Sequence, residues 1–117
     1  MNKTEPVTAK SEEKEKETEL DSIEYRIAKR GEKIVLDLKK NLGRSCFRYA
    51  VAENEKGANG FTYSIYASYS DGEKKTVGSI TDFSASREGT ESFCRLLARM
   101  LATPLSLESI YEDSLTP

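Results

Sequence analysis

The chain has 117 residues, of which 32% are charged and 37% hydrophobic, and its formal net charge is -2. This length suits a single domain, and the small net charge excludes a general attraction to nucleic acid or to anionic membranes. Histidine is absent, so the commonest general base and the commonest zinc ligand are both missing.

Residues 1–20 differ in composition from the rest of the chain, since they hold four Lys and six Glu. Such a segment cannot bury enough apolar surface to offset the entropy lost on ordering. We therefore predict a disordered charged N-terminal arm followed by a single α+β domain over residues 21–117. The chain shows neither the apolar run of a signal peptide nor that of a membrane span, which favours a cytoplasmic protein with no membrane contact.

Two strands are predicted directly after the arm, because hydrophobic residues recur there at every second position. The residues of each strand that share a face are Ile23, Tyr25 and Ile27, then Ile34, Leu36 and Leu38. A turn around Gly31 separates the two runs, so they are expected to pair as a hairpin.

Three further strands are predicted over residues 47–51, 61–69 and 75–82. In the strand at residues 61–69, every second residue from Phe61 onward is hydrophobic, and this face of the strand is expected to be buried. Tyr66 lies on the other face and is expected to be exposed. Gly78 lies inside the last strand and indicates a bulge or the close approach of another backbone segment. The five strands together predict an antiparallel β-meander.

Two helices are predicted after the sheet. Ser84 or Ser86 can cap a helix that begins near Arg87, and Thr103-Pro104 ends this helix and starts a short C-terminal one. The hydrophobic stripe of the first helix is Phe93, Leu96, Leu97, Met100 and Leu101. The predicted fold is therefore α+β, with a meander of about five strands packed against one amphipathic helix and a short C-terminal helix.

The two cysteines, Cys46 and Cys94, lie far apart in the sequence. Without an export signal, two reduced thiols are expected. Cys94 is next to the hydrophobic stripe, so we expect it to be buried and unreactive.

The C-terminal part carries a distinctive order of motifs. A Leu-rich stretch at residues 96–99 precedes Thr103-Pro104, and the pattern Leu107-x-x-Ile110-x-Glu112-Asp113 follows. With the predicted strands before it, this order resembles a family of short Firmicutes proteins catalogued as domain of unknown function 6514. The resemblance covers about residues 46–115 and implies a bacterial source but no activity. Members of that family usually have Phe-Leu where this chain has Ser114-Leu115.

No residues form a pattern typical of catalysis, cofactor binding or metal binding. Glu108 and Glu112 are four residues apart on the last predicted helix, a spacing that suits a divalent cation, but no further inward carboxylate is evident and a solvated helix edge is favoured. We therefore expect no enzyme activity, no cofactor and no metal.

These exclusions favour a non-catalytic protein-interaction or regulatory module with an unknown protein partner. The candidate partner surface is the C-terminal helix, because the burial of its few hydrophobic side chains does not outweigh the entropy cost of ordering it. A partner can then complete or displace the helix. The surface consists of Leu107, Ile110, Tyr111, Glu108 and Glu112.

A weak nucleic-acid-binding module is the alternative. Eight basic residues fall between Arg26 and Arg48, against only Glu32 and Asp37, and basic residues interleaved with aromatics on a sheet are typical of RNA-binding modules. The candidate contacts are Arg26, Arg30, Lys33, Arg48 and Tyr66.

Overall fold

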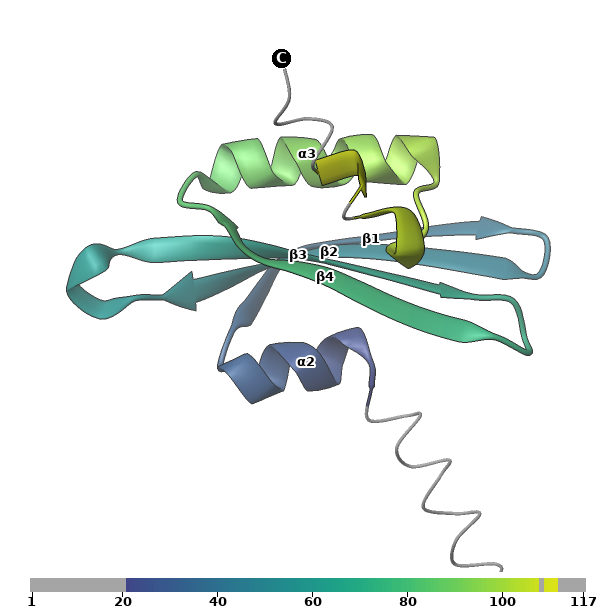
Figure 1. Cartoon of the computed structure of the whole chain (residues 1–117), viewed down its shortest axis with the longest axis horizontal. Coiled ribbons are helices and arrows are strands. Elements are labelled where there is room, and N and C mark those ends of the chain that lie inside the picture. The colour runs from purple at the N-terminus through teal and green to yellow at the C-terminus, as the bar shows by residue number, and fades with distance from the viewer. Residues whose placement is uncertain (1–20, 108, 112–117) are drawn as a thin grey trace, which may run out of the picture.

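The structure is a computed structural model that describes residues 21–107 and 109–111. These residues form an antiparallel sheet of four strands in the order β1-β2-β3-β4, with one helix on each face and a C-terminal segment that contacts β3 and β4 on the same face as the second helix (Figure 1). The elements in chain order are α2 (Ile23–Arg30), β1 (Lys33–Leu42), β2 (Ser45–Glu55), the 3-10 turn η1 (Gly57–Asn59), β3 (Phe61–Ser70), β4 (Lys75–Ser84), α3 (Arg87–Met100) and the 3-10 turn η2 (Pro104–Ser106). The predicted α+β meander is confirmed. The predicted disordered arm lies outside the described residues.

The first predicted strand is wrong, because α2 occupies its position. The side chain of Ser22 accepts a hydrogen bond from the amide of Tyr25 and starts the helix, and Gly31 ends it in the left-handed conformation with φ 69. Ile23 and Ile27 are both buried, and their spacing of four residues fits a helix as well as a strand. The predicted hairpin is therefore absent, and the described sheet has four strands instead of about five.

A bulge in β1 divides its hydrophobic residues between the two faces of the sheet. The register between β1 and β2 shifts between Ile34 and Leu36. Ile34 packs with the buried residues on the face of the sheet that α2 covers, whereas Leu36 and Leu38 pack with those on the face that α3 covers. The prediction that these three residues share one face is therefore wrong. Lys40, two residues after Leu38, then follows it onto the α3 face.

The α3 face of the sheet holds the larger core. Ser86 caps α3 as predicted, since its side chain accepts a hydrogen bond from the amide of Gly89 at 3.0 Å. The predicted stripe is partly wrong, because Leu96 is 38% and Met100 53% exposed. The buried residues of the helix are Thr90, Cys94, Leu97 and Ala98. Mostly small residues thus face the sheet, which allows the helix to pack closely against it.

The α2 face holds a second, smaller core of Ile23, Ile27, Ala50, Ala52 and Tyr66. The side chain of Tyr66, expected to be exposed, is fully buried there. The sequence correctly placed Tyr66 on the face of the strand opposite to the other hydrophobic residues, but it did not indicate that a helix covers this face.

The C-terminal segment begins at Thr103 as predicted, and η2 continues into helical residues at Leu107 and 109–111. Leu107 is 1% exposed and belongs to the larger core. The predicted close approach at Gly78 is confirmed, because a Cβ atom there would lie 3.0 Å from the carbonyl oxygen of Pro104.

The two cysteines are expected to react with a thiol reagent at very different rates in the folded protein. Cys94 is fully buried, and burial raises the pKa of its thiol to about 12, whereas Cys46 is half-buried. Timed labelling with a chromogenic disulfide, read by mass spectrometry, should modify Cys46 well before Cys94. Equal rates in the absence of denaturant would contradict the burial of Cys94, and equal rates in 8 M urea are the control.

Candidate functional site: a basic pocket between β1 and α3

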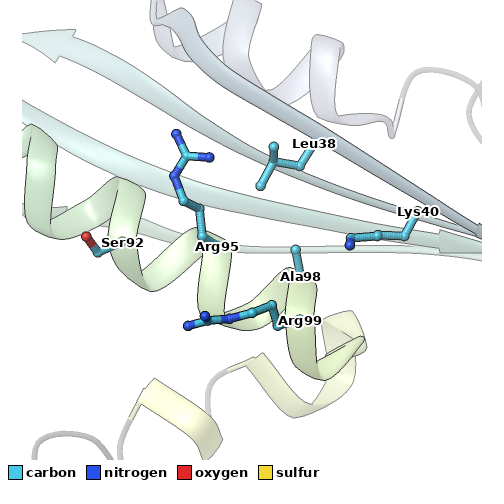
Figure 2. A pocket seen from close by; sticks show the side chains of 6 residues that line it. All are labelled: Leu38, Lys40, Ser92, Arg95, Ala98 and Arg99. Atoms are coloured by element: carbon cyan, nitrogen blue, oxygen red, sulfur yellow. The ribbon is translucent and has the colours of Figure 1, made fainter.

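An open pocket of about 410 Å³ lies between β1 and α3 (Figure 2). Its lining contains three positively charged side chains and no acidic one. The lining residues are Leu38 and Lys40 from β1 and Ser92, Arg95, Ala98 and Arg99 from α3. We refer to this site as the basic pocket.

The periodicity of each element places these side chains together. Leu38 and Lys40 are two residues apart on a strand, so both point to the α3 face, and Ser92, Arg95 and Arg99 follow the helical repeat along one side of α3. Figure 2 shows the Arg95 side chain extending from the helix toward the strands and that of Lys40 pointing from β1 toward the helix. The basic pocket is thus built by two elements that are distant in the sequence.

The charges of the basic pocket are not neutralised by the part of the chain that the structure describes. Lys40, Arg95 and Arg99 are all exposed, and none forms an ion pair with a described residue. Three cations around an apolar floor of Leu38 and Ala98 can attract a ligand that carries more than one carboxylate or phosphate.

Three arginines of the candidate nucleic-acid surface instead form ion pairs within the protein, and these arginines link α2 to the sheet. Arg26 pairs with Asp21 at 2.8 Å and also donates to Ser79 on β4, and Arg30 reaches Asp82 of β4 at 3.2 Å. Their charges are used within the protein, which leaves less for a phosphate backbone.

Arg48 is the most strongly engaged of these arginines. Its guanidinium donates to Asp37 of β1 through two nitrogens, at 3.0 and 2.8 Å, and to Glu24 of α2. The hydrogen bonds from Arg48 lower the pKa of the Asp37 carboxyl below its usual value. Of the remaining candidates, Lys33 is exposed at the start of β1 and Tyr66 is buried under α2. The structure therefore does not combine the five residues in one open surface.

A buried carboxylate organises the polar side of the smaller core. The Glu32 side chain is fully buried and accepts hydrogen bonds from the hydroxyls of Tyr66 and Ser64, from Arg30 Nε at 3.1 Å and from Asn54. Burial, and then the hydrogen bond to Glu32, raise the pKa of Tyr66 well above its usual value. Four protein donors already occupy the two oxygens, so this cluster has a structural role and does not present an open site.

The candidate partner surface on the C-terminal helix is divided. Leu107 is part of the larger core, Ile110 is half-buried against it, and the ring of Tyr111 lies 5.3 Å from that of Phe83. These three side chains pack against the domain, and this packing removes Leu107 from any open surface. Glu108 and Glu112, whose spacing suits a cation, both lie outside the described residues.

Sequence reasoning missed the basic pocket. The pair Arg95 and Arg99, four residues apart on a helix, was the available signal, and Lys40 belonged to the basic stretch already noted. Neither signal shows which strand lies next to the helix, because that depends on how α3 packs on the sheet.

Within the described residues, no helix combines the length and the hydropathy required for a membrane span. Comparisons with curated proteins and with solved structures found no match. A comparison with protein families found a match, and this match covers more of the chain than the C-terminal motifs do. The matched segment, residues 3–117, includes most of the charged arm. The chain belongs to the family described as Family of unknown function (DUF6514).

Proposed function

We propose that the chain is a non-catalytic protein-interaction module of the cytoplasm that binds an acidic segment of a partner protein in the basic pocket. One observation carries the proposal: Lys40, Arg95 and Arg99 line a common pocket and have no acidic partner among the described residues. Protein surfaces usually distribute charges of both signs, so a pocket with one sign favours a complementary ligand.

The lining of the basic pocket favours binding over chemistry. Ser92 supplies the one hydroxyl in the lining, and no carboxylate, imidazole or thiol lies among the lining residues to act as a base. A protein segment also suits an open pocket with an apolar floor, because its carboxylates can reach the cations while its aliphatic atoms cover Leu38 and Ala98.

The nucleic-acid alternative has less support. Single-stranded nucleic acid is typically held by exposed aromatic rings beside the basic residues, and the lining of the basic pocket has no aromatic residue. Tyr66, the ring that the alternative needed, is buried.

A fluorescein-labelled peptide of ten glutamates tests the proposal by fluorescence anisotropy. We expect saturable binding that weakens with added salt, and the double substitution Arg95→Gln and Arg99→Gln should weaken it about tenfold. The matched control is Arg87→Gln, since Arg87 lies on the same helix outside the basic pocket and pairs with Glu91.

Equal affinity for the double variant and for Arg87→Gln would refute the assignment of the pocket. Stronger binding of a labelled ten-nucleotide single-stranded DNA than of the peptide, lost in the same double variant, would replace the proposal with the nucleic-acid alternative.

A further inference from the structure

Beyond β1 the sheet has no strand among the described residues, so β1 is an edge. It pairs with β2 on one side only, and alternate residues along its length present their backbone amides and carbonyls toward the outside. Such an edge can accept an extended segment as an additional strand. The basic pocket lies directly along this edge, because Leu38 and Lys40 belong to β1.

The spacing of the cations suits a strand better than a helix or a compact loop. α3 runs along the strands (Figure 1), and Arg95 and Arg99 are four residues apart, which corresponds to about 6 Å along a helix axis. Alternate side chains of a strand are about 6.6 Å apart on one face. An added strand with carboxylates at every second residue would therefore offer one carboxylate to each arginine.

The chain itself contains such a sequence. Residues 13–19 read Glu-Lys-Glu-Lys-Glu-Thr-Glu, so Glu13, Glu15, Glu17 and Glu19 would share one face of a strand. A shift of the pairing by one residue would place Lys14 and Lys16 beside the cations instead. Charge thus selects the register in which the glutamates face α3.

Residues 13–19 can reach the edge of β1. Glu24 in the first turn of α2 binds Arg48, which is paired across the two strands with Lys39. The start of α2 therefore lies over the part of β1 that carries the basic pocket, on the opposite face of the sheet. Glu19 is three residues before Ser22, and three extended residues span about 10 Å, which is about twice the spacing between neighbouring strands of a sheet.

We propose that residues 13–19 of the chain's own arm add to the edge of β1 as a strand and place their glutamates against Lys40, Arg95 and Arg99. This inference rests on the proposed function, because the arm then competes with the acidic partner for the same pocket. A partner must displace the arm, so the arm sets the apparent affinity for every acidic ligand.

The first test measures competition in the full-length chain with the ten-glutamate peptide. Substitution of Glu13, Glu15, Glu17 and Glu19 by Gln should remove the competitor and tighten peptide binding about threefold, as expected if the arm occupies about two thirds of the pockets. The control chain has the same seven residues in the order Glu-Glu-Lys-Lys-Glu-Glu-Thr, which keeps composition and charge but leaves no two glutamates of residues 13–19 two positions apart. It should also bind the peptide more tightly than the natural sequence does.

The second test follows amide exchange in β1 by NMR without peptide. The natural arm should slow exchange at outward-facing amides near Leu38 and Lys40 relative to both variants, independently of protein concentration. Slowing that increases with concentration would assign the occupant to another copy and overturn the proposal. If the peptide binds the natural chain and both variants equally and amide exchange is unchanged, the arm does not dock and the proposed function stands. If the peptide binds none of the three chains while the arm still slows exchange in β1, the proposed function fails and the docking stands.

Discussion

Replacement of Glu32 by alanine is expected to lower the free energy of unfolding by about 3–5 kcal/mol, roughly the cost of leaving two buried hydroxyl groups without a hydrogen-bond acceptor. The substitution leaves the fully buried hydroxyls of Tyr66 and Ser64 without their acceptor, and it removes one of the two acidic partners of the partly exposed Arg30. Burial of unsatisfied polar groups is costly because water no longer solvates them.

Urea denaturation followed by circular dichroism measures this loss. Glu55→Ala is the control, since Glu55 is exposed at the end of β2 and should change stability by less than about 0.5 kcal/mol. Glu32→Gln should give an intermediate loss, because the amide keeps the shape and one acceptor oxygen. A loss below about 1 kcal/mol for Glu32→Ala would mean that the cluster rearranges to satisfy its donors, contrary to its assigned structural role.

Leu107→Ala is expected to cost about 2–5 kcal/mol of global stability. Its side chain is 1% exposed and belongs to the same cluster as Tyr49 and Leu97, so the substitution opens a cavity in the larger core. Ile110→Ala should cost less, because Ile110 is only half-buried. The comparison decides whether the C-terminal segment is an integral part of the fold or a detachable helix.

Amide exchange distinguishes the two possibilities. If the segment is integral, Leu107→Ala should increase exchange throughout β2 and β3 as well as in the segment. An increase confined to residues from Leu105 onward, with an unchanged sheet, would instead show that the C-terminal helix opens separately and would restore it as a candidate partner surface.

Most of the sheet and the long helix could be predicted because local signals there are long and agree with one another. β3 has ten residues whose hydrophobic side chains alternate except at Tyr66, and α3 has a clear cap at Ser86. α2 was misassigned because a spacing of four residues between Ile23 and Ile27 satisfies both periodicities, and the cap at Ser22 that decides between them was not recognised.

The other differences arise from tertiary packing, which a single sequence does not display. The sheet face below α3 is filled by large side chains such as Tyr49 and Phe47, so small residues of the helix, Cys94 and Ala98, fit against it better than Leu96 and Met100 do. The burial of Tyr66 was missed for a related reason. The predicted fold has a strand where α2 lies, so it lacks the helix that covers Tyr66.

The candidate site depends on the same packing. Lys40 and the two arginines of α3 are distant in the sequence, and only the position of α3 beside β1 makes them neighbours. Conversely, the clustering of Arg26, Arg30 and Arg48 in the sequence suggested a common surface, but Arg30 and Arg48 pair with Asp82 and Glu24, which the sequence does not place nearby.

The absence of a side chain at Gly78 sets the depth at which the C-terminal segment lies in the molecule. Gly78 is paired with Ala67 in the sheet, and the buried Pro104 packs directly over Gly78. Even one methyl group at position 78 would meet the backbone of Pro104 at 3.0 Å and would lift the segment by a few tenths of an ångström. Leu107 would move outward with the segment. The fit of the Leu107 side chain in the larger core therefore depends on the lack of a Cβ atom at position 78 of β4.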